Sequence, residues 1–189
     1  FCDSLASVII PNSVVNIGEG AFRCCESLTT INIPDSVTNI RRLAFSFCKS
    51  LSFITIPNGV TTIEENAFEW CESLTSITIP ASVTNIDLYA FFYCHSLTTI
   101  IVDENNQVYD SRDNCNAIIH TATNTLIFGC CKTNIPNSVT NIGNSAFESC
   151  PSLTAITIPD SVTSIGDFAF SFCDSLASVI IPNSVVNIG

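Results

Sequence analysis

A motif that recurs at a constant interval of 23 along nearly the whole chain is the feature that most constrains how it can fold. Leucine holds one place in the unit, at Leu5, Leu28, Leu51, Leu74 and Leu97, then at Leu153 and Leu176. Proline holds a second place, at Pro11, Pro34, Pro57, Pro80, Pro136, Pro159 and Pro182. Phenylalanine holds a third place, at Phe22, Phe45, Phe68, Phe91, Phe147 and Phe170. Self-similarity at one fixed period predicts stacked, equivalent units, which we call rungs.

One rung, for example Leu74 to Ser96, consists of two short extended pieces joined by turns. Its opening, L-x-x-I-x-I, alternates apolar and other residues as a strand does. The proline that follows has no backbone N–H to donate to a neighbouring strand, so it ends the strand. Val83 and Ile86 predict a brief extended piece on the opposite wall, and the A-F-x-x-C segment turns the chain back. We therefore predict a repeat solenoid, a β-rich coil of stacked rungs with short extended pieces on opposite walls.

A single rung cannot be stable by itself. Its roughly six large inward side chains are worth about 1.5 to 3 kcal/mol each when fully buried. Ordering the rung costs roughly 1.5 kcal/mol for every residue. Stacking covers both flat faces of a rung and lets its strand pair with the next, so stability is expected to be a property of neighbouring rungs.

The rung resembles the BspA-like, Treponema pallidum-type leucine-rich repeat, and the match of the Leu, Ile, Pro, Ala-Phe and Cys positions covers nearly the whole chain. The resemblance implies a leucine-rich-repeat solenoid, a β-rich right-handed coil with a parallel concave sheet and short extended or turn segments on the convex side. It implies a protein that is extracellular or on the cell surface. It also implies an adhesin that binds host matrix proteins or other cells. We expect one domain over residues 1–189, with rungs that start at residues 5, 28, 51, 74, 97, 130, 153 and 176.

One rung is longer than the others. The interval from Leu97 to Leu153 corresponds to one ordinary rung and one lengthened by ten, with Cys130 in the leucine place. Within residues 102–129, two apolar stretches, 117–120 and 125–128, flank the polar residues 121–124. This pattern predicts a hairpin insert, either projecting from the stack or packed along it.

Residues 1–18 are identical to residues 172–189, which indicates a longer, 171-residue period above that of the rung. Two interpretations stay open for the ends of the array. The chain is an excerpt of a longer array, or its ends dock head to tail in a fibre. The fibre is a second function hypothesis, a structural repeat that associates with itself.

Charge excludes several kinds of partner. The chain carries 17 acidic and 6 basic residues, for a net charge of −11, whereas nucleic acids and anionic membranes need Lys and Arg to replace counterions. No apolar run is long enough to span a membrane, and the segment shows no signal peptide. We expect a protein partner or end-to-end self-association, with no nucleic acid and no membrane insertion.

Seven cysteines share one column of the repeat, at Cys2, Cys25, Cys48, Cys71, Cys94, Cys150 and Cys173. Neighbouring parallel strands lie about 4.8 Å apart, whereas bridged cysteines need Cβ atoms about 3.8 Å apart. We therefore expect a structural ladder of free thiols beside the phenylalanine column. A bridge from Cys115 to Cys130 or Cys131 could still hold the insert together.

No catalytic or metal-binding set stands out from the repeat. Cys94 precedes His95, but neighbouring residues of an extended segment point apart. The acidic stretch from Asp103 to Asp113 lacks the glycine and the final glutamate of an EF-hand loop. We expect no enzyme activity, no metal and no cofactor.

Aromatic residues precede most of the ladder cysteines and are the best candidates for binding a partner. This place in the rung holds Phe1, Cys24, Phe47, Trp70, Tyr93, Ser149 and Phe172. Stacking would align Phe47, Trp70 and Tyr93, with Phe92 beside them. Exposed rings would form a binding hot spot, whereas rings folded over the rung edge would be peripheral core.

Two further features complete the candidate surface. Phe53 is the one aromatic residue on the outward face of the predicted sheet. Glu64, Glu65, Glu69 and Glu72 make the surroundings of Trp70 acidic. We therefore expect the partner to present basic groups to this surface.

Overall fold

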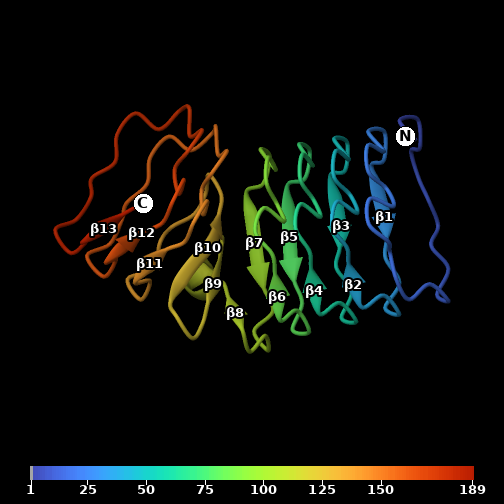
Figure 1. Ribbon diagram of the computed structural model, residues 1–189, viewed down its shortest axis with the longest axis horizontal. Coiled ribbons are helices and arrows are strands. Elements are labelled where there is room, and N and C mark those ends of the chain that lie inside the picture. The colour runs from blue at the N-terminus through green and yellow to red at the C-terminus, as the bar shows by residue number, and fades with distance from the viewer. Residues whose placement is uncertain (1) are drawn as a thin grey trace. The chain divides into compact units, whose positions relative to one another are not determined.

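The computed structural model describes residues 2–189, and Phe1 of the predicted aromatic column lies outside the described residues (Figure 1). The chain forms two compact units, which we call the first and the second unit. The first ends at Leu97 and the second begins at Thr98. This division falls at the leucine that opens the lengthened rung.

The first unit is a β-solenoid with two walls of short parallel strands. One wall, the first wall, contains β1 (Thr30–Asn32), β3 (Phe53–Thr55) and β5 (Ser76–Ile79). The second wall contains β2 (Asn39–Ile40), β4 (Thr62–Ile63) and β6 (Asn85–Ile86). Both walls pair equivalent places of successive rungs, as in Thr30 with Phe53 and Asn39 with Thr62. The predicted leucine-rich-repeat solenoid is therefore confirmed.

The register follows from burial on alternate sides of each strand. In β1, Ile31 is buried while Thr30 and Asn32 face solvent, and β3 repeats this pattern. Large inward side chains of successive rungs pack on one another, and the rings of Phe22, Phe45, Phe68 and Phe91 form a stack. Their centroids are 5.5, 5.4 and 5.5 Å apart, and the planes are within 6° of parallel. Apolar columns of this kind run through the unit and hold its rungs together.

The turn between the two walls contains two residues with left-handed backbone in each rung. The second of these places is held by Phe47 (φ 61), Trp70 (φ 58) and Tyr93 (φ 58). This conformation costs a non-glycine residue about 1–2 kcal/mol. The turns compensate with a ladder between rungs, in which Phe47 N donates to Glu69 O and Trp70 N to Phe92 O, both at 2.8 Å.

The second unit contains the hairpin that the sequence predicts. It begins with β7 (Thr99–Val102), β8 (Tyr109–Asp110) and the short 3-10 helix η1 (Arg112–Asn114). Strands β9 (Ala117–His120) and β10 (Thr125–Gly129) then pair antiparallel. The next rungs supply β11 (Asn141–Ile142), β12 (Ser164–Ile165) and β13 (Asn187–Ile188).

The hairpin is packed into the second wall of its unit and does not project from it. Strand β10 pairs parallel with β11, and the six-stranded sheet has the order β13-β12-β11-β10-β9-β8 (Figure 1). On the first wall, the described rungs that start at Cys130, Leu153 and Leu176 have no assigned strand. In the first of them, Asn134 N donates to Cys115 O of the insert at 3.0 Å.

Gly129 takes the place of the column phenylalanine in the lengthened rung. Its N–H donates to Ala146 O at 2.8 Å, as Phe45 N does to Ala67 O in the first unit. A Cβ atom on Gly129 would overlap Cε1 of Phe147 and lie 2.7 Å from Cζ of the same ring, which is fully buried. Only glycine therefore fits beneath the Phe147 ring as it stands.

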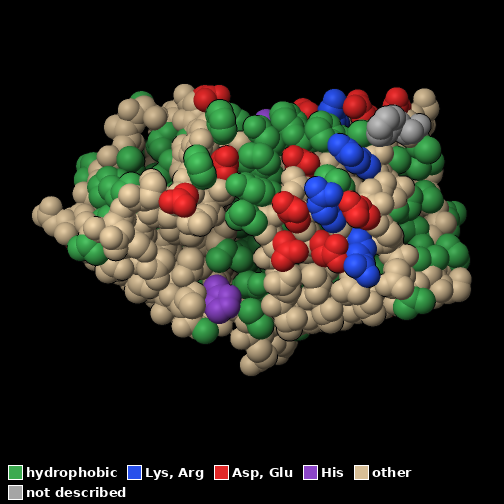
Figure 2. Space-filling model, in the orientation of Figure 1, with side chains coloured by type: hydrophobic (Ala, Val, Ile, Leu, Met, Phe, Trp, Pro, Cys, Tyr) green, Lys and Arg blue, Asp and Glu red, His purple; other side chains and the backbone are tan. Residues whose placement is uncertain are grey.

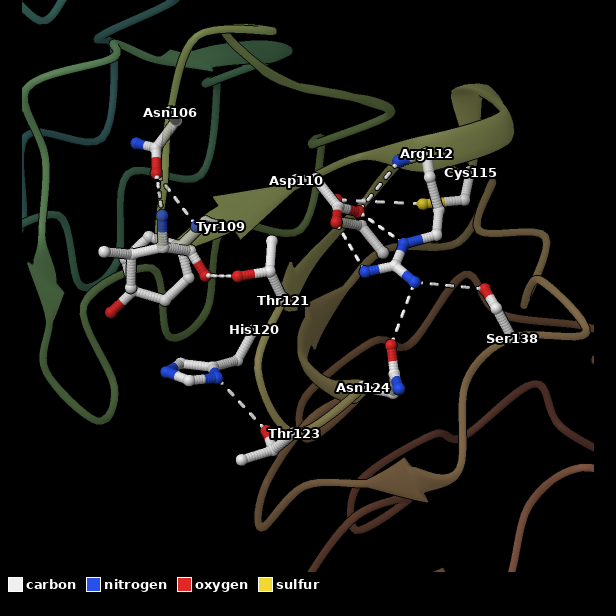
Figure 3. A network of polar contacts seen from close by, with 12 residues as sticks. Asn106, Tyr109, Asp110, Arg112, Cys115, His120, Thr121, Thr123, Asn124 and Ser138 are labelled. Atoms are coloured by element: carbon white, nitrogen blue, oxygen red, sulfur yellow. Dashed lines mark hydrogen bonds and ion pairs between the residues drawn. The ribbon is translucent and has the colours of Figure 1, made fainter.

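Arg112 holds the insert against its neighbours (Figure 3). Its guanidinium donates to the carboxylate of Asp110 through Nε (2.8 Å) and Nη2 (2.5 Å). Its Nη1 donates to Asn124 Oδ1 in the hairpin turn (2.9 Å) and to Ser138 Oγ in the next rung (3.3 Å). The side chains of this bidentate ion pair are about a quarter to a third exposed. Through all its hydrogen bonds, Arg112 connects its own segment with the hairpin turn and the next rung.

Candidate functional site

Phe47, Trp70 and Tyr93 form one row of stacked rings on the first unit, which we call the aromatic strip. The centroids of Phe47 and Trp70 are 5.7 Å apart with planes at 16°. Those of Trp70 and Tyr93 are 3.9 Å apart with planes at 14°. The strip exists because a step of one rung places the same turn position directly over its equivalent.

All three rings of the aromatic strip are half-buried. They differ in this from Phe45 and Phe68, whose side chains are fully buried in the core column. Because neighbouring rings of the strip cover each other's faces, ring edges make up much of what remains accessible. The strip is thus intermediate between fully exposed rings and rings that belong to the peripheral core, the two arrangements that the sequence left open.

The aromatic strip widens at the rung of Tyr93. Phe92 packs on Tyr93 with centroids 4.2 Å apart and on Tyr89 at 5.0 Å. The imidazole of His95 stands edge-on to Trp70 (5.9 Å, 65°) and to Tyr93 (5.5 Å, 73°). Sequence reasoning placed Phe92 here but missed Tyr89 and His95. Their place in the rung, close before and after Tyr93 in the same turn, is the signal that could have found them.

The other two candidate aromatic residues lie elsewhere. Phe53 is in β3 on the first wall, 55% exposed, so it faces solvent from the strand and not from the turn. Phe172 is in the second unit and is 61% exposed. It holds the same place in its rung as Trp70, but its equivalent in the preceding rung is the buried Ser149. Neither residue extends the aromatic strip.

The neighbourhood of the aromatic strip is acidic because its basic side chains are already paired. Arg42 binds Glu19 (2.9 Å) and Glu65 (3.2 Å), whereas Lys49 binds Glu26 (3.1 Å). The remaining pair is Arg41 with Glu64 at 3.3 Å. Figure 2 shows acidic and basic side chains interleaved in one patch.

Glu69 and Glu72 flank Trp70 in sequence and form no ion pair among the residues that the structure describes. Glu69 accepts a hydrogen bond from Ser46 Oγ at 3.2 Å. The pKa of Lys49 is raised, mainly by its hydrogen bond with Glu26 and more weakly by Glu72. The strip is therefore bordered by two carboxylates that a basic partner could approach.

The ladder cysteines donate their thiol hydrogens to the backbone of the preceding rung. Cys48, Cys71 and Cys94 lie 3.1, 3.3 and 3.2 Å from the carbonyl oxygens of the column phenylalanines one rung earlier. Burial raises the pKa of Cys48 and of Cys94 to about 12. A thiol that keeps its proton is a donor and not a nucleophile, so the Cys94–His95 neighbourhood offers no thiolate chemistry.

Cys115, Cys130 and Cys131 form no disulfide bond in the structure. Cys115 Sγ lies 3.8 Å from Ala117 O, and burial raises its pKa to about 11. Cys130 Sγ lies 3.6 Å from Asn116 O. The bridge from Cys115 to Cys130 or Cys131 is therefore not formed here, and hydrogen bonds to the backbone take its place.

The acidic stretch of the second unit uses its oxygens for local hydrogen bonds. Asp103 Oδ1 accepts from Asn105 N at 2.9 Å, and Asp110 binds Arg112. His120 Nδ1 lies 3.2 Å from Thr123 Oγ1 (Figure 3). Within residues 2–189, no group of three or more His, Cys, Asp and Glu residues is placed to hold a metal ion. No helix described there has the length and apolar character of a membrane span.

Comparison with protein families identifies the repeat. A model described as "BspA type Leucine rich repeat region" matches in six copies over residues 1–118 and 126–189. No curated protein matches the chain.

Solved structures of bacterial repeat proteins are similar to this chain. A leucine-rich cell surface protein from Faecalibacterium prausnitzii is 34% identical with a TM-score of 0.75, over 97% of this chain and 56% of that one. A leucine-rich repeat protein from Eubacterium ventriosum is 26% identical with a TM-score of 0.77, over 99% and 56%. The pneumococcal vaccine antigen PcpA is 25% identical with a TM-score of 0.76, over 91% and 44%. The chain thus spans about half the length of these proteins.

Proposed function

The chain belongs to the BspA-type leucine-rich-repeat family, and on that basis we propose that it is a non-catalytic, protein-binding module of a cell-surface or secreted protein. The similarity to a leucine-rich cell surface protein and to a pneumococcal antigen supports the location. Adhesion to a host matrix protein or to another cell-surface protein is the activity we propose for it.

The observation that carries this proposal is the aromatic strip. Trp and Tyr are enriched among the residues that dominate binding energy at protein interfaces, because they combine a large apolar surface with a polar group. Stacking fixes the rings of Phe47, Trp70 and Tyr93, so little rotamer freedom is left to lose on binding. Their partly accessible edges form a rigid contact surface.

The partner we propose presents basic and apolar side chains together. Glu69 and Glu72 border the aromatic strip and form no ion pair among the described residues, so they favour a cation brought by the other protein. Opposite charge at the rim speeds association and excludes acidic partners. Binding should therefore weaken as ionic strength rises.

Replacing Phe47, Trp70 and Tyr93 together by serine tests the proposal. Ser149 already holds the same place of its rung at φ 58, so this turn accepts serine. We expect at least about tenfold weaker binding to immobilised extracellular-matrix proteins, as loss of a hot spot requires. Far-ultraviolet circular dichroism should stay unchanged.

Phe53→Ser is the matched control, because it removes an exposed ring from the first wall and leaves the strip intact. It should bind like the unchanged chain. Unfolding of the triple variant would mean that the rings are core. A folded triple variant that binds as well as the parent would contradict the strip as the site.

A second candidate function is structural self-association into a fibre. The identity of residues 1–18 with residues 172–189 favours it, because two places in the chain then offer the same surface. Light scattering and electron microscopy separate the two candidates. A binding module stays monomeric at micromolar concentration, whereas a fibre-forming repeat grows with concentration.

A further inference from the structure

We propose that Asn58 is a site of spontaneous covalent modification, at which its side-chain amide is lost by cyclisation onto the backbone nitrogen of Gly59. The two residues lie in the turn that joins β3 to β4 (Figure 1). They form the one Asn–Gly pair in the sequence. The aromatic strip is built from the turn that follows β4, so this inference does not rest on the proposed function.

The reaction needs no reagent besides water. The backbone nitrogen of Gly59 loses its proton and attacks Cγ of Asn58. A new N–C bond forms, the C–N bond of the side-chain amide breaks, and ammonia leaves, so that the product is a cyclic succinimide. Water then opens the ring at either carbonyl. One opening gives aspartate, and the other gives isoaspartate, in which the main chain runs through the former side chain.

Both reacting groups are accessible in the structure. Asn58 is exposed and Gly59 is half-buried, in a turn closed by a bond from Val60 N to Pro57 O at 3.0 Å. Among the described residues, neither the amide of Asn58 nor the N–H of Gly59 has a hydrogen-bond partner. Nothing therefore holds the amide carbon away from the nitrogen that attacks it.

The equivalent turns of three other rungs carry a serine hydroxyl that ties them to the rung before. Ser36 Oγ donates to Val14 O (2.5 Å), Ser82 Oγ to Val60 O (2.6 Å) and Ser161 Oγ to Val139 O (2.6 Å). Gly59 holds this place in its own rung and has no hydroxyl, so its turn lacks the tether. Glycine also has more accessible backbone conformations than serine. The turn at Asn58 should therefore reach the cyclisation geometry more readily than an Asn–Ser turn.

Close packing favours glycine at this place. A Cβ atom on Gly59 would lie 2.2 Å from Asp35 O and 2.8 Å from Val37 O, which are backbone atoms of the preceding rung. Backbone atoms cannot give way as the end of a flexible side chain does, so a larger residue fits only if the turn moves. The packing that selects glycine thus also keeps the reactive pair in the chain.

The products should change the first unit in two ways. Asp35 holds the place of Asn58 one rung earlier and is also exposed, so a carboxylate at position 58 would add a like charge beside it. Isoaspartate would also lengthen the main chain inside the turn that leads to the fully buried Val60. Modification should therefore make the chain more acidic and its third rung less stable with time.

Incubation of the full chain at neutral and at mildly alkaline pH tests the proposal, with proteolysis and tandem mass spectrometry at intervals. Deamidation at Asn58 should be several-fold faster than at Asn137, which holds the same place in its rung but is followed by Ser138. The rate should rise with pH, because the nitrogen of Gly59 must lose its proton. An isoaspartate-specific methyltransferase should label the same peptide, since direct hydrolysis of the amide would give aspartate alone.

Two variants serve as controls, and circular dichroism checks that each folds like the parent. Asn58→Gln keeps an amide in the turn but lengthens the side chain, which disfavours the ring, so the label should be lost. Gly59→Ser turns the pair into Asn–Ser and should slow the reaction several-fold. The comparison of Asn58 with Asn137 within one chain does not depend on the folding of either variant.

Three results would overturn the proposal. The first is an equal rate at Asn58 and Asn137 in the native chain. The second is methyltransferase labelling that persists in Asn58→Gln. The third is deamidation at Asn58 in the urea-unfolded chain while the native chain stays intact, because the folded turn would then protect the pair.

Discussion

The two units use the same repeat for different arrangements. In the first unit both walls advance by one regular rung at each step, and the phenylalanine stack runs unbroken from Phe22 to Phe91. In the second unit Gly129 stands where a phenylalanine would be, and the stack is limited to Phe147 and Phe170 at 5.3 Å. The comparison shows that a hairpin can be inserted into one wall when glycine takes the place of a column phenylalanine.

The units also differ in how their buried polar groups are satisfied. In the first unit, Ser46 is fully buried, and its hydroxyl donates to Glu69. Within the described residues, the buried side-chain oxygens without a hydrogen-bond partner all lie in the second unit, at Ser145, Glu148, Ser149 and Ser184. Ser149 occupies the place that Trp70 holds in the first unit. At this place in the turn, the first unit has the half-buried rings of Phe47, Trp70 and Tyr93, whereas the second unit has the buried, polar Ser149.

The largest effect should come from interrupting the complete phenylalanine stack. Phe68 has a stacked ring on both sides and is fully buried, so Phe68→Ala should lower the free energy of unfolding by about 3–5 kcal/mol. Phe170 is half-buried and stacks on Phe147, so Phe170→Ala should cost clearly less. Urea unfolding followed by circular dichroism measures both. Equal costs would contradict the view that a stacked ring on each side adds to the stability at Phe68.

Adding one methyl group at Gly129 should have the next largest effect. Its Cβ atom would overlap the Phe147 ring, so Gly129→Ala should destabilise the second unit by about 1–3 kcal/mol. Gly18→Ala is the control, because no atom lies within 4 Å of the Cβ atom it would add. Replacing the Phe147 ring by the smaller leucine side chain, in the double variant Gly129→Ala/Phe147→Leu, should recover part of the lost stability. An unchanged unfolding midpoint for Gly129→Ala would show that the site has room for a side chain.

Most of the fold could be predicted from the sequence because the repeat is long and regular. Leucine, proline and phenylalanine columns fix the register, and the structure pairs equivalent residues of successive rungs on both walls of the first unit. The hairpin follows from two apolar stretches around residues 121–124. Its packing into the second wall could not be predicted, since pairing of β10 with β11 depends on which edge the insert reaches.

The features that sequence reasoning missed depend on contacts or conformations that the repeat hides. Trp70 has a left-handed backbone, but its large side chain gives no sign of the glycine-like geometry. Arg112 binds Asn124 and Ser138, at separations along the chain that do not fit the repeat interval. The alignment of Phe47, Trp70 and Tyr93 follows from their spacing, whereas their degree of burial depends on how the turn folds over the rung edge.

The smallest effect should be a difference in pH dependence between the thiols of the two units. Burial raises the pKa of Cys48 from 9.0 to about 12, and it also raises the pKa of the half-buried Cys173. An unfolded thiol loses its proton near pH 9 while folded Cys48 keeps it, so stability is full below pH 9 and falls as pH rises towards 12.

Between the unfolded and the folded pKa, each buried thiol should lower the free energy of unfolding by at most about 1.4 kcal/mol per pH unit. Cys48→Ala should therefore flatten the alkaline loss of stability more than Cys173→Ala does, after each is referred to its own stability at neutral pH. Urea unfolding at several pH values between neutral and strongly alkaline measures the slopes. If both variants flatten the curve equally, the thiols of Cys48 and Cys173 are equally protected from solvent, which would contradict the expected difference.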